Sequence, residues 1–427
     1  MFPLCSDDAS DSESMSESHD PMLPPVVLVH GLKGSFLREG ISGKRRYVTV
    51  LQLLRLQSDQ IPLPLQRDTN GRQVSDGLLP DGPIQEIAAL GITLATFYGD
   101  FIRGVGQSRE VILFSYDWRR ELAESGRLLE QFLESVRSEH GGRSAQVVCH
   151  SMGGLITMPV LNRRPELFHS VLFAAAAIGS GVSFLPDVSD VEAPGNLMGL
   201  NKTMLTPRNW LGWPSPNFFW PLLGQPNSQG GPHLVEADGS AVQCDFHNIK
   251  DWKTLRLGPY HPNSGVDMDS EADAFFAETL AQAQAYKRLV VCDPAVMYPP
   301  IAVLNSDAEP TITSFRREGI DQPFNMLQGF ATTPGDGRVA LSDAHPPPGV
   351  PVLRTITNSR SHSEVLSDLS HVHELLNDLL EEATRRGQTA GSRRKSTSQT
   401  VSRMGTPASF HTVSRMGTPP SILTPRS

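Results

Sequence analysis

The chain has 427 residues, enough for one large α/β domain with insertions or for two ordinary domains. Its net charge of −9 argues against a nucleic-acid partner, since such partners select basic surfaces. The four cysteines, Cys5, Cys149, Cys244 and Cys292, lie far apart and lack the spacing of metal ligands or of a disulfide framework. We therefore expect neither a metal nor another cofactor.

Charge and composition predict where the ordered part of the chain begins and ends. The first twenty residues carry six acids and no Lys or Arg, whereas the chain after Glu382 carries eight Lys or Arg and no acid. We interpret residues 1–22 and 384–427 as disordered tails and residues 23–383 as the folded domain. The octapeptide TVSRMGTP occurs twice in the basic tail, which suggests either a duplicated phosphorylation motif or a solvated segment without a role.

Hydrophobic runs suggest where the protein resides. No apolar leader occurs in the first twenty residues, and no apolar run reaches membrane-spanning length. A cytoplasmic location with no signal peptide or transmembrane helix is the expectation.

Short apolar runs alternate with segments of helical periodicity along the domain. Buried parallel strands have such continuous apolar runs, and amphipathic helices connect them. The expected strands are 26–29, 111–115, 146–149, 170–174, 301–305 and 352–356, and the expected helices include 121–136 and the segment from Val365 to Leu379. The alternation predicts an α/β fold, a mostly parallel sheet with helices on both faces.

This alternation stops between about residues 186 and 285, which we interpret as an inserted cap or lid. Three of the five tryptophans lie within eleven residues of this insertion, beside two phenylalanines: Trp210, Trp213, Phe218, Phe219 and Trp220. Two interpretations are open. The aromatic side chains form either a mobile lid that contacts a lipid surface or the packed core of a closed cap.

The segment QVVCHSMGGLIT, residues 146–157, combines a short strand, a sharp turn and the start of a helix. A nucleophile elbow has this layout and lifts a serine side chain clear of the sheet. Ser151 is at the corner, and Cys149 occupies the position of the usual first glycine. The alternative is a tight turn in a Rossmann-like domain.

A serine hydrolase of this kind needs an acid and then a histidine downstream of the nucleophile. The glycines around Asp336 favour it over Asp307 and Asp343, because they permit a sharp turn. His362 lies in the loop before the last helix, where the base is expected. The other histidines are weaker candidates or structural neighbours of the turns: His30, His150, His345, His371 and His373.

Several motifs, in order along the chain, resemble the lecithin:cholesterol acyltransferase family, which includes the phospholipid:diacylglycerol acyltransferases. They are PVVLVHGLKGS at 25–35, YDWR at 116–119, VVCHSMGG at 147–154, YPPIAVLNSDAEPT at 298–311, PGDGRVALSD at 334–343 and HSEVLSDLSHVHELLNDLL at 362–380. The resemblance covers roughly residues 24–380 and implies an α/β-hydrolase fold. Departures from the family pattern are Cys149 in place of glycine and His30 in place of proline.

The resemblance also assigns roles to individual residues. It implies that Ser151 is the nucleophile, Asp336 the acid and His362 the base. It further implies that backbone N–H groups stabilise the oxyanion, those of Leu32 or Lys33 and of Met152. Asp117 and Arg119 are expected to form a structural ion pair near the elbow.

The function implied is acyl transfer from a glycerophospholipid or a similar lipid ester, at a lipid or peripheral membrane surface, to a lipid hydroxyl. With water as acceptor, the same first step makes the protein a phospholipase or lipase. A third hypothesis is a catalytically inactive hydrolase fold that serves as a binding module.

Overall fold

The computed structural model describes residues 22–49, 61–89, 92–189 and 207–401. The chain divides into two compact units, Met1–Ala383 and Thr384–Ser427. The sheet, the cap and the candidate site all belong to the first unit. Residues 1–21, which hold nearly all of the predicted acidic tail, lie outside the described residues.

Six parallel strands form the central sheet of the first unit, in the order β14-β11-β9-β8-β1-β7. This confirms the predicted fold class. Apart from β14, the strands are short and rich in apolar residues, as strands covered on both faces are. The edge strand β14 has the sequence RTITN, and most of its side chains are exposed or half-buried. The strands are β1 (Val26–Val29), β7 (Val111–Phe114), β8 (Ala145–His150), β9 (Phe168–Ala174), β11 (Ile301–Ser306) and β14 (Arg354–Asn358).

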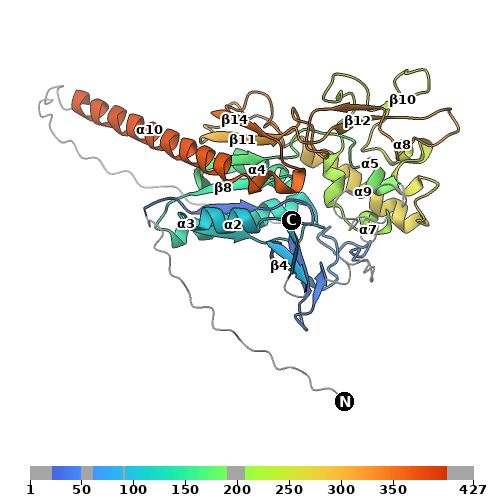
Figure 1. The fold of residues 1–427 in the computed structure, drawn as a ribbon, viewed down its shortest axis with the longest axis horizontal. Helices are drawn as coiled ribbons and strands as arrows, with labels where there is room; N and C mark the ends of the chain where they lie inside the picture. The colour runs from blue at the N-terminus through green and yellow to red at the C-terminus, as the bar shows by residue number, and fades with distance from the viewer. Residues whose placement is uncertain (1–21, 50–60, 90–91, 190–206, 402–427) are drawn as a thin grey trace, which may run out of the picture. The chain divides into compact units, whose positions relative to one another are not determined.

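Successive residues of β1 point to opposite faces of the sheet, because side chains alternate along a strand. Val27 and Val29 pack into the core shared with α3 (Leu122–Glu139) and α4 (Met152–Arg163). Val26 and Leu28 pack into a second core, with α2 (Gly99–Gly106) and the first turns of α10 (Leu369–Val401). Figure 1 shows these helices alongside the sheet. Both faces are thus covered, as the sequence predicts.

The remaining elements surround the sheet. Three small sheets contain β2 (Ser35–Glu39), β3 (Arg45–Tyr47) and β4 (Leu78–Pro83), then β5 (Glu86–Ala89) and β6 (Ile92–Thr96), then β10 (Leu234–Val235), β12 (Thr311–Arg316) and β13 (Ala331–Thr333). The cap helices are α5 (Leu185–Ser189), α7 (Pro207–Leu211), η2 (Ser215–Phe219), α8 (Ile249–Thr254), η3 (Gly258–Tyr260) and α9 (Ser270–Lys287). Two further 3-10 helices are η1 (Pro165–Leu167) and η4 (His362–Ser367).

The aromatic side chains of the cap are buried. Each of the five is exposed by 2% or less: Trp210, Trp213, Phe218, Phe219 and Trp220. Trp213 donates its indole N–H to the Ile61 carbonyl at 2.9 Å and meets Trp118 edge-on, with ring centroids 4.9 Å apart. Edge-on ring pairs of this kind add about 0.5–1.5 kcal/mol to the gain from burial.

The predicted lipid-contact surface at these five residues is therefore not present in this structure. Buried rings cannot touch a lipid surface, and the packed-core interpretation describes the arrangement. Composition alone did not distinguish the two, because tryptophan is favoured both in cores and at membrane interfaces. Among the helices of the described residues, none combines the length and apolarity required to cross a bilayer.

The C-terminal helix extends further than expected. The backbone of α10 remains helical to Val401, so residues 384–401 differ from the predicted disordered tail. No proline interrupts this stretch, so every backbone N–H can take part in the helical hydrogen bonds. The rest of that tail, including nearly all of the repeated octapeptide, lies outside the described residues.

The buried cap makes a prediction about stability. Trp213→Ala is expected to lower the free energy of unfolding by about 3–5 kcal/mol, because it leaves a large cavity in the core. Leu223→Ala is the control: Leu223 is 60% exposed, and its truncation is expected to change stability by about 0.5 kcal/mol or less. Urea denaturation of both variants measures the effect. Unchanged stability in Trp213→Ala together with lost vesicle binding would restore the lipid-contact interpretation.

Candidate active site

Ser151 occupies the sharp turn between β8 and α4. Its backbone has φ +54° and ψ −123°, a strained conformation for a residue with a side chain. Its N–H donates to the Ala174 carbonyl at 3.1 Å, and its carbonyl accepts from Ala177 N–H at 3.1 Å. These hydrogen bonds attach the turn to the end of β9 and hold the strained conformation in place.

Glycines let neighbouring segments approach this turn closely. A Cβ on Gly31 would lie 2.7 Å from the Ser151 Cβ, and one on Gly154 would lie 2.6 Å from the Ala176 Cβ. A Cβ on Gly153 would collide with the Val29 carbonyl. Glycine at these three positions is thus required by sterics.

The structure brings the three predicted triad side chains together. His362 Nε2 lies 2.9 Å from Ser151 Oγ, and His362 Nδ1 lies 2.7 Å from Asp336 Oδ2. Ser151 and Asp336 are buried, with 4% and 3% exposed, and part of the His362 side chain reaches solvent. Serine, imidazole and carboxylate in this order can generate an alkoxide nucleophile and stabilise the imidazolium that forms.

Asp336 is held in its ionised form. Its Oδ1 accepts the backbone N–H groups of Arg338 at 2.9 Å and Val339 at 2.7 Å. Burial by itself raises the pKa of Asp336, but the nearby His362 and these hydrogen bonds outweigh it, so the pKa lies below its ordinary value. The Nδ1 atom of His362 therefore faces a carboxylate and carries the proton, which leaves Nε2 to accept from Ser151.

The other candidate acids do not contact His362. Asp307 is exposed and accepts the Ser359 hydroxyl at 3.0 Å. Asp343 has Ser342 as its hydrogen-bond partner, at 3.5 Å. Burial raises the pKa of Asp343 to about 6, although the Lys287 ammonium opposes this shift.

The other candidate bases also lie elsewhere. His371 on α10 hydrogen-bonds Asp368 at 2.7 Å, and His345 contacts the Asn305 side chain at 3.3 Å. His373 likewise belongs to α10. Neither of these two contacts involves Ser151. The imidazole that contacts Ser151 is that of His362, in the segment before α10.

The predicted oxyanion donors lie on two elements beside Ser151. Met152 is the first residue of α4, where backbone N–H groups have no intrahelical acceptor. Leu32 and Lys33 follow β1, and Lys33 has φ +59°, so the loop turns sharply there. The Gly31 N–H donates to the Tyr98 hydroxyl at 3.0 Å and is already in use. Burial and Arg338 lower the pKa of the Lys33 amine to about 8, and Asp187 opposes this shift.

The motif Tyr116–Arg119 packs against the loop that follows β1. The buried Arg119 side chain forms ion pairs with Asp117 at 2.8 Å and with the more exposed Asp76 at 2.6 Å, and it donates to the Ile61 carbonyl at 3.0 Å. Tyr116 donates its hydroxyl to the His30 carbonyl at 2.6 Å, and its ring stacks on the His30 ring. The expected ion pair is present, and Arg119 also joins this turn to the early loops that carry Ile61 and Asp76.

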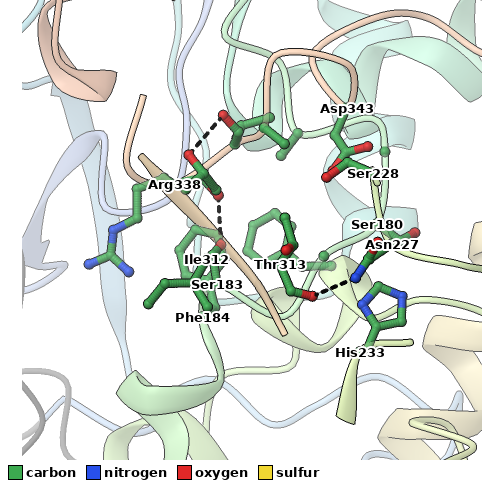
Figure 2. Close-up of a pocket in the computed structure, with 17 residues that line it drawn as sticks. Ser180, Ser183, Phe184, Asn227, Ser228, His233, Ile312, Thr313, Arg338 and Asp343 are labelled. Atoms are coloured by element: carbon green, nitrogen blue, oxygen red, sulfur yellow. Dashed lines mark hydrogen bonds between the residues drawn. The ribbon is translucent and has the colours of Figure 1, made fainter. Parts of the chain in front are cut away.

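A small pocket lies beside the loop that carries Asp336. Figure 2 shows His233, Asn227 and Thr313 grouped on one side of it, while the Arg338 guanidinium extends away from it. That guanidinium pairs with Asp187 at 2.6 Å. Neither Ser151 nor His362 lines the pocket, so it is separate from the reactive side chains. Among the residues that the structure describes, no group of three or more His, Cys, Asp or Glu could hold a metal ion.

Sequence reasoning treated His150 as a structural neighbour and did not single out Tyr98. Both are buried and contact the site: Tyr98 Oη lies 2.8 Å from His150 Nδ1, and His150 Nε2 lies 2.9 Å from the His362 carbonyl. The one available signal was the position of His150 directly before the nucleophile. Tyr98 belongs to none of the motifs found in the sequence, so no signal pointed to it.

Comparison with known proteins supports the fold. Residues 101–210, about a quarter of the chain, match the family model Hydrolase_4, described as serine aminopeptidase, S33. The structure is also similar to the crystal structure of the Tle4-Tli4 complex, with a TM-score of 0.51 and 12% identity, covering 84% of this chain and 98% of that chain. The protein has the α/β-hydrolase fold.

Two further proteins are similar to this chain. A lipase of Bacillus licheniformis, BlEst2, is 13% identical with a TM-score of 0.35, over 85% of this chain and 94% of the lipase. An uncharacterised protein of Saccharomyces cerevisiae, YJR098C, is 24% identical over 81% of this chain. The match spans 60% of the length of that yeast protein.

The site makes a prediction that separates two of the candidate acids, Asp336 and Asp343. Asp336→Asn is expected to slow the reaction of Ser151 with a fluorophosphonate by about 10³- to 10⁴-fold, because the amide no longer fixes the His362 tautomer. Asp343→Asn is the matched control and is expected to retain most of the rate. The labelling rate constant of each variant is the measurement. A slow Asp343 variant beside a fast Asp336 variant would reverse the assignment.

A second prediction concerns pH and stability. Because the pKa of Asp343 is raised to about 6, the folded protein binds more protons than the unfolded chain between about pH 4 and pH 6. Stability contributed by this group therefore falls as pH rises through that range. Asp343→Asn is expected to melt higher than the wild type at pH 7, with the difference shrinking toward pH 4. Thermal melts across this range test it, and a difference independent of pH would contradict it.

Proposed function

We propose that this protein is a serine hydrolase that cleaves carboxylic esters of lipids through an acyl-enzyme on Ser151. The observation that supports the proposal most directly is the unbroken contact from Ser151 Oγ through His362 to Asp336, at 2.9 Å and 2.7 Å. These distances suit proton transfer in the resting state. The strained backbone of Ser151 supports it as well, because strain of this kind is retained at functional sites.

The proposed reaction begins with His362. Its Nε2 accepts the Ser151 proton as Oγ attacks the ester carbonyl, and the carbonyl oxygen becomes an oxyanion. The tetrahedral intermediate collapses, the ester C–O bond breaks, and the imidazolium returns its proton to the leaving alcohol. Water then attacks the acyl-enzyme with His362 again as base, and releases a carboxylic acid and free Ser151.

The oxyanion needs donors that are already in position. Met152 N–H, at the start of α4, is proposed as one donor, because the partial positive charge of a helix N-terminus favours an anion there. The N–H of Leu32 or Lys33 is proposed as the other. The Tyr98 hydroxyl engages the Gly31 N–H, which leaves the donation to the next residues of the loop.

The lipid class of the substrate rests on the resemblance of the ordered motifs to lecithin:cholesterol acyltransferases. That resemblance also favours a second candidate function, transfer of the acyl group to a lipid hydroxyl. One structural observation supports the transfer: Ser151 is 4% exposed, and exclusion of water protects an acyl-enzyme from hydrolysis. Binding at a peripheral membrane surface and a cytoplasmic location belong to the same proposal.

Covalent labelling tests the nucleophile. A fluorophosphonate probe is expected to label the wild type on Ser151, and Ser151→Ala is expected to lose all labelling while it keeps the wild-type melting temperature. Ser125→Ala is the matched control, because Ser125 on α3 is also buried but donates its hydroxyl to the Glu121 carbonyl. Labelling of the Ser151 variant at the wild-type rate would refute the assignment.

Product analysis separates hydrolysis from transfer. Purified protein is incubated with acyl-labelled phosphatidylcholine vesicles, with and without diacylglycerol or sterol. We expect labelled fatty acid that depends on Ser151. Labelled triacylglycerol or sterol ester in its place would favour the transferase, and turnover of a soluble short-chain ester without any lipid turnover would overturn the lipid class.

A further inference from the structure

His150 joins the nucleophile turn to the segment that carries the base. It is the last residue of β8, directly before Ser151, and its ring is buried. Its Nε2 lies 2.9 Å from the backbone carbonyl of His362, while the two rings lie side by side with centroids 5.1 Å apart. The contact is therefore with the main chain of the base and leaves the His362 ring free for Ser151 and Asp336.

The directions of these hydrogen bonds follow from elementary chemistry. A carbonyl oxygen only accepts, so His150 Nε2 carries the proton and donates it to His362. Burial, together with the nearby His362, lowers the pKa of His150 to about 3, so the ring is neutral and its Nδ1 is an acceptor. Tyr98 Oη must then donate to Nδ1, at 2.8 Å.

The chain of hydrogen bonds continues into the oxyanion loop. Tyr98 Oη accepts the Gly31 N–H at 3.0 Å while it donates to His150. Gly31 in turn lies against Ser151, where a Cβ would come within 2.7 Å of the serine Cβ. Gly31 N–H thus donates to Tyr98, Tyr98 to His150 Nδ1, and His150 Nε2 to the His362 carbonyl. All three hydrogen bonds donate in the same direction, from Gly31 toward His362.

Neighbouring anchors do not replace this contact. Ser306 Oγ donates to the Arg360 carbonyl, and Asn358 Nδ2 donates to the Val365 carbonyl at 3.2 Å. These bonds hold the segments before and after His362. The carbonyl of His362 itself is held by His150.

We propose that Tyr98 and His150 form a positioning unit that couples the oxyanion loop to the base, so that the donors and His362 keep a fixed geometry around Ser151. The inference rests on the proposed function and adds two residues to it. Neither residue touches the reacting atoms. The unit acts through the main chains of Gly31 and His362.

Misplacement by about 1 Å can cost a reaction of this kind about 100-fold. Tyr98→Phe removes one hydroxyl and keeps the ring. His150→Phe keeps a ring and removes both hydrogen bonds. His150→Gln retains a side-chain N–H at a similar distance from the backbone and serves as the conservative variant.

The test is the rate constant of fluorophosphonate labelling, which reports on Ser151 whatever the natural substrate is. We expect Tyr98→Phe and His150→Phe each to lower it by about 10- to 100-fold. The double variant is expected to be no slower than the slower single variant, because residues that act as a unit are not additive. His150→Gln is expected to recover most of the rate. Tyr286→Phe, which removes a buried hydroxyl bonded to the Leu155 carbonyl at 3.0 Å, is the control and is expected to label at the wild-type rate.

A spectroscopic readout separates positioning from general destabilisation. The proton between His362 and Asp336 is expected to give a far-downfield proton NMR signal in the wild type, which is lost or broadened in Tyr98→Phe and His150→Phe and retained in Tyr286→Phe. Thermal melts accompany each variant.

Unchanged labelling rates in the Tyr98 and His150 variants would overturn the inference. So would additive losses in the double variant, or losses that Tyr286→Phe reproduces at an equal fall in melting temperature. Failure of the proposed function would give a different result, because the wild-type protein itself would then not react with the fluorophosphonate.

Discussion

The close approach of β1, β8 and β9 at the elbow is the constraint on which the site depends. Ser151 adopts φ +54° because the chain must reverse there between a strand and a helix that are both buried. Any side chain at Gly153 or Gly154 would separate the layers. Strain at one residue is tolerated because hydrogen bonds to Ala174 and Ala177 fix the turn from the neighbouring strand.

Electrostatics at the site follow from burial and from backbone donors. Asp336 is almost fully enclosed, yet two N–H groups and one imidazole keep its pKa low, whereas Asp343 lacks such donors and has a raised pKa. Two carboxylates on one loop thus have pKa values shifted in opposite directions, because Asp336 has the nearby His362 and backbone donors whereas burial dominates at Asp343. His150 is kept neutral beside His362, so its ring adds no positive charge next to the proposed base.

The cap and the sheet share one hydrophobic core. Trp213 and Trp220 belong to the same buried cluster as Val29 and Met152, which flank the oxyanion loop and the nucleophile. Packing in the cap is thereby continuous with packing under the site. A large cavity in the cap is therefore expected to shift the packing around Ser151, since close-packed interiors transmit strain.

Features that depend on local periodicity and on steric requirements can be predicted from the residues alone. Continuous apolar runs identify the buried strands, and the glycines around Ser151 identify the turn, because only those residues satisfy its geometry. The carboxylate that contacts His362 was favoured for the same reason, its flanking glycines. Tertiary structure decided what depends on contacts between distant residues. His150 and His362 are 212 residues apart, and no spacing rule predicts that the imidazole of one meets the carbonyl of the other. Whether the cap tryptophans face lipid or protein was likewise a matter of packing, since tryptophan suits both surroundings and only the neighbouring elements determine which one surrounds it.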